Sequence, residues 1–251
     1  MLFEYLDKQG LQVLVDKVNT KIKKLQNEVD ELKIKNGGNI TVKEDLYIGE
    51  SSLDINKTTT INLNGCELSA KGSEERGDTV IVSGGEVVIE NGKIVASEDR
   101  KENSGVIRVE GDANVELNGL EIENGNCVYV LSNQTPKVEI NNCKLTTTAS
   151  QCVYVGTGNG KVTINSGEFK SQDWGNVYYT LNLKDSLVNE DGSNVRDFIE
   201  VKGGVFYNFN PGEAYCEKVK PVSFVADGYT VIEEVVDENT TKYTVVPETE
   251  K

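Results

Sequence analysis

The sequence contains no histidine, one tryptophan and four prolines, and it has no long apolar run. Without histidine, the chain cannot carry a Ser-His-Asp or Cys-His catalytic set, nor a histidine-ligated metal. No stretch approaches the ~18 apolar residues of a membrane-spanning helix, so we expect no membrane insertion. An enzyme built from this chain would have to use carboxylate, lysine, tyrosine or cysteine side chains.

Basic residues are also scarce, because 26 Lys and Arg stand against 41 Asp and Glu, which gives a formal net charge of −15. Nucleic acids and anionic membrane surfaces are bound by clustered basic side chains. The composition therefore predicts no nucleic-acid partner. The acidic pairs Glu74-Glu75 and Glu98-Asp99 are interpreted as solvated loops, so we expect neither a metal nor a cofactor.

The cysteines form no recognisable metal or disulfide pattern. They include no Cys-x-x-Cys pair, and an odd number at wide spacing is not typical of a disulfide framework. Met1 to Gly10 lack the basic and apolar regions of a signal peptide. We expect free thiols and synthesis in a reducing cytosol. The five cysteines are Cys66, Cys127, Cys143, Cys152 and Cys216.

A heptad pattern runs from Leu11 to Lys35, a segment without glycine or proline. Its apolar residues recur every seven positions in two series, as the a and d positions of a coiled coil do. Asn36-Gly37 suits the end of a helix. An amphipathic helix lying on its own domain is the alternative. The predicted self-association residues are Val15, Ile22 and Val29 at a, with Leu11, Val18, Leu25 and Leu32 at d.

After Gly38 the helical period gives way to short alternating runs rich in Val, Ile, Asn and Thr. A unit similar to Val-x-Ile-x-Asn-Gly-x-Ile recurs about every 25 residues, too short a period for a propeller blade. Stacked coils of a parallel β-helix explain this period, with the inward residues of each coil packing on the coils above and below. The central apolar residues of the units are Leu63, Ile89, Leu117, Ile140, Ile164 and Val201.

Stacking places equivalent residues of successive coils in columns. One column, Asn118, Asn141 and Asn165, is expected to form a ladder of hydrogen-bonded amides. A second, outward column alternates in charge and would fix the register, because a slip by one coil would oppose like charges. A tyrosine column either stabilises the sheet by stacking or binds a sugar or a subunit. The charge column is Glu67, Lys93, Glu121, Lys144 and Glu168, and the tyrosine column is Tyr129, Tyr154 and Tyr178.

Several segments resemble the pectate-lyase-like superfamily of right-handed parallel β-helices. The resemblance rests on Thr60-Ile61-Asn62-Leu63-Asn64-Gly65 and on the later Ile-x-Asn-Gly units. The ending from Gly203 to Val231 is similar to the ends of β-helix proteins from tailed phages and bacterial surfaces. The opening Tyr5-Leu6-Asp7-Lys8-Gln9-Gly10-Leu11, followed by a helix, resembles the start of phage fibre proteins. The superfamily includes lyases, hydrolases, adhesins and virion proteins.

The resemblance implies a structural virion protein of a tailed phage, a head fibre or capsid decoration assembled in the host bacterial cytoplasm. Such fibres are usually homotrimers, so we expect a trimer, although β-branched residues at a with leucine at d favour two strands. Weak attachment to host surface glycans or mucus, through the tyrosine column or residues 183–198, is a further expectation. The segment implied to dock on the capsid has the apolar residues Met1, Leu2, Phe3, Tyr5 and Leu6.

A polysaccharide-degrading depolymerase or a bacterial surface adhesin is the alternative. Glycosidases hold two carboxylates about 5–10 Å apart, and Glu116 and Glu139 align in adjacent coils, with Asn62 and Val88 before them. The repeat places no arginine beside them, and the lone Trp174 supplies little of the aromatic platform of a sugar cleft. We therefore expect no enzymatic activity and assign no catalytic residue.

These interpretations predict an all-β fold, a single-stranded right-handed solenoid in each chain, preceded by a helical coiled coil. A solenoid needs its last coil covered, so the end of the chain is expected to be a cap. The predicted parts are an anchoring peptide at 1–10, a coiled-coil helix at 11–36, a parallel β-helix at 37–209 and a C-terminal β cap at 210–251.

Overall fold

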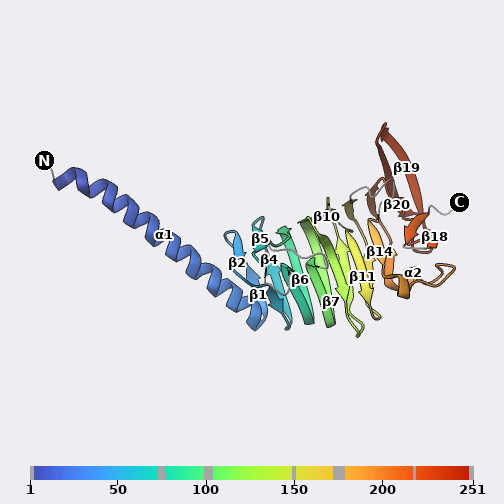
Figure 1. Ribbon diagram of the computed structural model, residues 1–251, viewed down its shortest axis with the longest axis horizontal. Coiled ribbons are helices and arrows are strands. Elements are labelled where there is room, and N and C mark those ends of the chain that lie inside the picture. Colours follow the sequence, from blue (N-terminus) through green and yellow to red (C-terminus); the bar gives the residue numbers. More distant parts are fainter. Residues whose placement is uncertain are drawn as a thin grey trace.

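The computed structural model describes residues 3–72, 77–98, 104–148, 151–171, 179–216 and 219–248, with only the backbone described for 3–9, 219 and 220. A single long helix, α1 (Phe3–Asn36), projects from one end of a mostly β body (Figure 1). The body is a parallel β-solenoid of about five turns. The predicted solenoid after an N-terminal helix is confirmed. The helix begins at Phe3 rather than Leu11, so the segment assigned to a separate peptide continues it.

Each turn of the solenoid adds a strand to three parallel ladders, which differ in the direction they face. Ladder one contains β1 (Gly38–Thr41), β4 (Thr59–Asn62), the middle of β6 (Val80–Val95) and of β7 (Gly105–Glu123), β9 (Lys137–Asn141), β12 (Lys161–Ile164) and β15 (Ile199–Val201). Ladder two contains β2 (Leu46–Ile48), β5 (Glu67–Ala70), the ends of β6 and β7, β10 (Cys143–Thr146), β13 (Gly167–Lys170) and β16 (Gly204–Tyr207). Ladder three contains β3 (Leu53–Ile55), the starts of β6 and β7, β8 (Asn126–Leu131), β11 (Val153–Thr157) and β14 (Leu181–Leu183).

The Asn-Gly motif of the repeat marks the corner between ladders one and two. Asn91, Gly119 and Asn142 have φ values of 59°, 58° and 51° at this corner. Glycine and asparagine tolerate this left-handed conformation better than other residues. The repeat therefore carries a residue that permits a sharp bend at the corner where the chain passes from ladder one to ladder two.

The core consists of apolar columns that run along the solenoid. Ile89, Leu117 and Ile140 lie side by side in ladder one and are almost fully buried. Ile164 and Val201 continue the same column, as predicted.

The sequence alignment was wrong by two residues at the first unit of this column. Ile61, not Leu63, pairs with Ile89, although Leu63 is itself buried at the following corner. For the same reason Thr60, not Asn62, precedes Val88 on the outward side. The corner after β4 has two more residues than the equivalent corner of the next coil. An alignment of the units without gaps cannot account for this difference in length.

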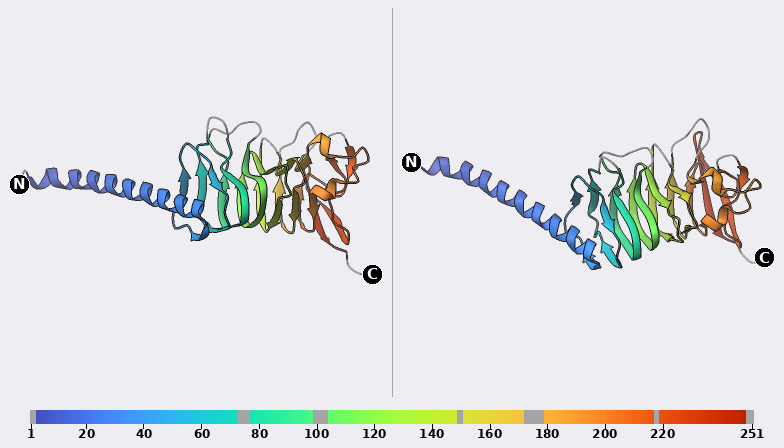
Figure 2. Two further views of the ribbon diagram at one scale, coloured as in Figure 1. Left: turned by 90° about the horizontal axis from the view of Figure 1, so that it is seen from below. Right: turned by 60° about the horizontal axis from the view of Figure 1, so that its bottom comes forward.

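The last turns of α1 close the first coil of the solenoid. Ile34 is fully buried in the core, and Asp30 is 6% exposed. The Asp30 carboxylate accepts hydrogen bonds from the amide of Gln26 at 3.1 Å and from Lys33 at 3.1 Å. Both further views show the rest of α1 extending beyond the solenoid (Figure 2). The last turns of the helix thus cover one end of the solenoid core, and the earlier turns do not contribute to this cover.

The C-terminal part lies against the other end. Phe206 stacks on Phe169 with ring centroids 4.8 Å apart, and Phe209 packs between Phe206 and Phe224. Val225 bridges to Val201 in ladder one. The insertion predicted at 183–198 contains the short helices η1 (Asp185–Leu187) and α2 (Val195–Phe198). The remaining strands are β17 (Ala214–Cys216), which pairs with β18 (Val219–Val222), and β19 (Tyr229–Asp237), which pairs with β20 (Thr240–Pro247), itself antiparallel to β16.

Candidate assembly interface

The predicted self-association residues form an exposed apolar stripe along α1, called the seam below. Within this single chain, their exposure ranges from 44% to 60%. Full burial of a Leu, Ile or Val side chain is worth about 1.5–3 kcal/mol, so this surface gains from a partner. The seam comprises Leu11, Val15, Val18, Ile22, Leu25, Val29 and Leu32.

The solenoid contacts the opposite face of the helix. With Val29 and Leu32 at positions a and d, Asp30 falls at b and Ile34 at f. These two side chains, at b and f, are the ones that the first coil buries. In a coiled coil, f points away from the neighbouring helices. The solenoid therefore occupies the side that an assembly would leave outside, and the seam is not blocked by its own chain.

A groove of about 380 Å³ lies at the C-terminal end of the seam. Four of the residues that line it lie at positions i, i+3, i+4 and i+7 of α1. In a coiled coil, four residues at this spacing form the hole that receives one side chain, the knob, of a facing helix. The first strand, β1, closes the groove at its far end. The helix residues are Val29, Leu32, Lys33 and Asn36, and the closing residues are Gly37, Asn39 and Ile40.

Two exposed apolar residues of α1 lie outside the seam and were not selected from the sequence. Val13 and Leu14 are 53% and 57% exposed and fall at heptad positions f and g. They line a second groove of about 520 Å³ that also includes Lys17 and Lys21. A search restricted to a and d positions cannot find them, although the apolar run Val13-Leu14-Val15 was a visible signal.

The predicted capsid anchor falls largely outside what the structure can test. Phe3, Tyr5 and Leu6 belong to α1, but their side chains lie outside the described part of the chain. Met1 and Leu2 lie outside the described residues altogether.

The alternating charge column has the register that the sequence predicted. Glu67, Lys93, Glu121, Lys144 and Glu168 are successive partners on ladder two. Lys144 donates to Glu121 at 2.6 Å, and Lys93 lies 3.7 Å from Glu67. The hydrogen bond from Lys144 lowers the pKa of Glu121, and the same bond raises the pKa of Lys144.

The asparagine ladder is confirmed at the corner of ladder one. The amide of Asn165 donates to Asn141 at 2.9 Å, and the amide of Asn141 donates to Asn118 at 2.9 Å. Asn118 in turn donates to Glu116 at 3.1 Å. The middle amide, that of Asn141, therefore uses its donor toward one coil and its acceptor toward the other, which ties three coils together.

The tyrosine column differs from the prediction at its third member. Tyr129 and Tyr154 are neighbours with ring centroids 5.3 Å apart, but the partner of Tyr154 on the next coil is Asn182. Tyr178 lies outside the described residues. Tyr129 is only 7% exposed, and burial raises the pKa of its hydroxyl. Its ring therefore offers little surface to a sugar, and the stacking role suits it better.

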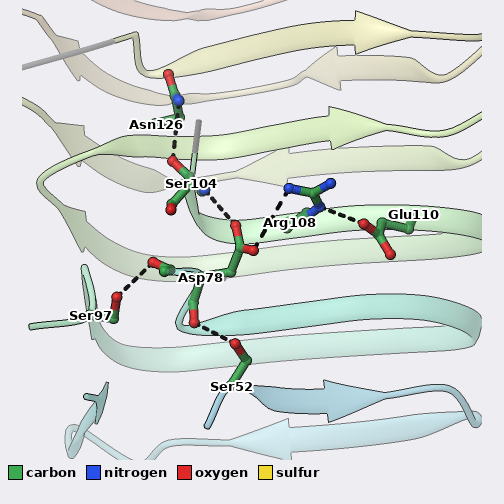
Figure 3. A network of polar contacts seen from close by, with 9 residues as sticks. Ser52, Asp78, Ser97, Ser104, Arg108, Glu110 and Asn126 are labelled. Carbon is green, nitrogen blue, oxygen red and sulfur yellow. Dashed lines mark hydrogen bonds and ion pairs between the residues drawn. The ribbon is translucent and has the colours of Figure 1, made fainter. Parts of the chain in front are cut away.

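Arg108 precedes Tyr129 in this column and connects it to a polar network that the sequence did not indicate (Figure 3). Its guanidinium lies 5.4 Å from the Tyr129 ring centroid, 2.5 Å from Glu110 and 3.8 Å from Asp78. Asp78 is 1% exposed and accepts the backbone N–H of Gly105 at 2.7 Å. Because these groups come from adjacent coils, the network joins coils in a way that apolar packing cannot.

The same network reaches one coil further in each direction. The Ser52 hydroxyl donates to the carbonyl of Asp78 at 2.7 Å, and the Asn126 amide donates to the carbonyl of Ser104 at 3.2 Å (Figure 3). The only sign of it in the sequence is a polar residue just before each strand, Asp78 before β6 and Ser104 before β7. We assign the network a structural role.

The alternative carboxylate pair lies on the outward side of ladder one. Glu116 and Glu139 are direct partners on adjacent coils. They line a shallow groove of about 250 Å³ together with Glu86, Asn114 and Lys137. This arrangement brings three carboxylates, those of Glu86, Glu116 and Glu139, and the ammonium group of Lys137 to a single surface.

In the part of the chain that the structure describes, the other functional groups considered from the sequence do not form a site, and Glu74, Glu75 and Asp99 lie outside that part. Among the residues described, no three acidic or cysteine side chains gather as metal ligands, and no helix combines the length and apolar character needed to span a membrane. None of the five cysteines forms a disulfide, and burial raises the pKa of the Cys127 thiol well above its usual range.

Comparison with known family models, with curated proteins and with solved structures finds no match for this chain.

Proposed function

We propose that this chain is a self-assembling structural rod, with α1 gathering several copies and the solenoid of each copy displayed beyond the bundle. The observation that carries the proposal is the exposed seam on the side of α1 that faces away from the solenoid. A single chain has no partner for this surface, whereas a second copy presents the matching stripe. A coiled coil of residues 11–36 is the expected form.

The biological setting follows from the resemblance of the sequence to phage fibre proteins. We infer a fibre or capsid decoration of a tailed phage, assembled in the host bacterial cytoplasm and carried on the virion. A homotrimer, a right-handed coil and docking on the capsid through the N-terminal end belong to this proposal. The chain as a whole has a formal net charge of −15, which suits a display element better than a nucleic-acid contact.

Two charged substitutions in the seam test the assembly. Ile22→Asp together with Leu25→Asp places carboxylates at adjacent a and d positions, where association would bury them. Sedimentation equilibrium of the full chain should find a homo-oligomer for the natural sequence and a monomer for the variant, with an unchanged β signal in circular dichroism. Thr20→Asp with Lys24→Asp, at f and c positions, is the matched control and should remain oligomeric. An oligomer that survives the seam variant would assign assembly to the solenoid.

Location on a virion has its own test. Phage particles are purified from a lysate in which this chain is produced, and their proteins are identified by mass spectrometry. The chain should remain with the particles through a density gradient. Recovery only in the soluble fraction would contradict the virion proposal and leave the assembly proposal standing.

Weak attachment to host surface glycans or mucus is a secondary part of the proposal. Because Tyr129 is buried, we infer contact through the other predicted segment, residues 183–198, which lies beside a groove of about 500 Å³ lined by Asp191, Arg196, Asp227 and Tyr229. A glycan array probed with the assembled protein should show binding that Arg196→Ala reduces. An array without signal would remove this part.

Polysaccharide cleavage is the second candidate, and the adjacent Glu116 and Glu139 in one groove are the observation that favours it. Purified protein is incubated with bacterial capsular polysaccharides, and the release of reducing ends is measured. We expect no release. Activity that Glu139→Gln abolishes would replace the structural proposal with a depolymerase.

A further inference from the structure

Asn36 is the last residue of α1 and continues the a series of the heptad pattern. It follows Val29 by seven residues, and its side chain is exposed in the single chain. The series thus consists of three apolar residues, Val15, Ile22 and Val29, followed by one amide. A single asparagine at an a position fixes the register and number of strands of a coiled coil at some cost in stability.

The residues that line the groove at the end of the seam indicate which side chain would fill it. The α1 residues that line it occupy heptad positions a, d and e and position a of the following heptad. In a parallel coiled coil, this set of four receives the d-position side chain of the neighbouring helix. At this level of the helix the knob is Leu32 of a second copy. When that Leu32 enters the groove, the Asn36 side chains of the two copies meet across the bundle axis.

We infer that Asn36 is the specificity-determining residue of self-assembly, through amide hydrogen bonds between the Asn36 side chains of neighbouring copies. This inference rests on the proposed function. A slip by one heptad would bury the amide against Val29 without a partner, which is disfavoured. The copies are therefore parallel and in register. Because Gly37 and β1 follow at once, their solenoids begin at the same height.

The first experiment removes the amide from the full chain. Asn36→Ile should lower the dissociation constant of the assembly about tenfold or more, since an apolar residue replaces a polar one at the interface. It should also produce additional stoichiometries in sedimentation equilibrium. Thr20→Ile, at an exposed f position, is the control and should change neither. An Asn36→Ile protein with the natural affinity and a single stoichiometry would overturn the inference.

The second experiment tests the register directly. Asn36→Cys places thiols across the axis only if the copies are parallel and aligned, so oxidised glutathione should join chains through this position. Thr20→Cys points outward and should give only the background of the unmodified protein, whose natural cysteines are mostly buried. Equal cross-linking in the two variants would also overturn the inference.

The two proposals fail in different ways. A natural chain that sediments as a monomer would reject the proposed assembly and the role of Asn36 together. A natural chain that is oligomeric, but whose Asn36 variants behave like the Thr20 controls, would reject only the role of Asn36.

Discussion

Helix α1 and the solenoid use the same kinds of apolar residues in opposite ways. The seam residues of α1 are about half exposed, whereas the inward residues of the solenoid are almost fully buried. Each coil meets its partner in the next coil of the same chain, so the solenoid is complete within one molecule. The helix repeats along one direction only, and its apolar stripe stays about half exposed in the single chain. One hydrophobic pattern is thus buried within the chain itself, and the other is left on the surface.

The largest expected effect comes from the point where the two regions meet. Deleting residues 1–36 removes Ile34 and Asp30 and uncovers the first coil, whereas deleting residues 1–25 keeps both. Both proteins should be monomeric, but the longer deletion should lose about 3–5 kcal/mol of unfolding free energy, as for loss of a large core side chain. Urea unfolding followed by circular dichroism measures the difference. Equal stability would show that α1 does not cap the solenoid.

A matched pair of leucines separates the two regions next. Leu117 is fully buried in the solenoid, and Leu25 is 60% exposed on α1. Leu117→Ala should lower the unfolding free energy of the solenoid by about 2–5 kcal/mol, because it leaves a cavity. Leu25→Ala should leave that value unchanged and weaken only association, which sedimentation equilibrium measures. A Leu25→Ala variant that destabilises the β signal would contradict the division of roles.

The asparagine ladder carries a smaller effect. Asn141→Ala breaks one hydrogen bond to Asn118 and one from Asn165, and it leaves both neighbours without that partner. We expect a loss of about 1–3 kcal/mol in urea unfolding. Asn133→Ala, at an exposed position beside ladder three, is the control and should be neutral. If Asn141→Ala left the free energy of unfolding unchanged, the ladder would follow from the repeat without stabilising the fold.

The smallest effect belongs to the charge column and depends on pH. Lys144 holds the pKa of Glu121 below its ordinary value of 4.5, so their contact stabilises the fold above that pH. The contribution is lost as the pH falls through the lowered pKa in the folded protein. Lys144→Met should therefore lower the urea midpoint of unfolding slightly at pH 7, because solvent screens this exposed pair, and should leave it unchanged near pH 2. Lys170→Met should show no such pH dependence, and a cost for Lys144→Met that is constant with pH would rule out the ion pair as its cause.

Several features of the solenoid were predictable because they depend on residues at a constant spacing. The Asn118, Asn141 and Asn165 ladder and the alternation from Glu67 to Glu168 need only the repeat length. The same reasoning failed where the length of a connection changes. Because the corner after β4 is longer, Ile61 rather than Leu63 pairs with Ile89. On ladder three, Asn182 of β14 rather than Tyr178 is the partner of Tyr154.

The candidate interface was predictable in its members but not in its surroundings. The heptad positions identified the seam from Leu11 to Leu32. They could not show that Ile34 and Asp30 bury the opposite face, or that β1 closes a groove beside Asn36. The network around Asp78 and Arg108 also joins residues from coils that are adjacent only after folding.

The periodic features of this protein are encoded locally in its sequence: the seven-residue pattern of the helix, the coil of about 25 residues, and the columns that follow from it. A period is a local property, and repeating it needs no knowledge of distant contacts. The tertiary structure decided what lies at the ends and corners, where no neighbour of the same kind follows. There, the burial of Ile34, the partner of Tyr154 and the hole that Asn36 completes depend on how differently shaped segments pack against one another.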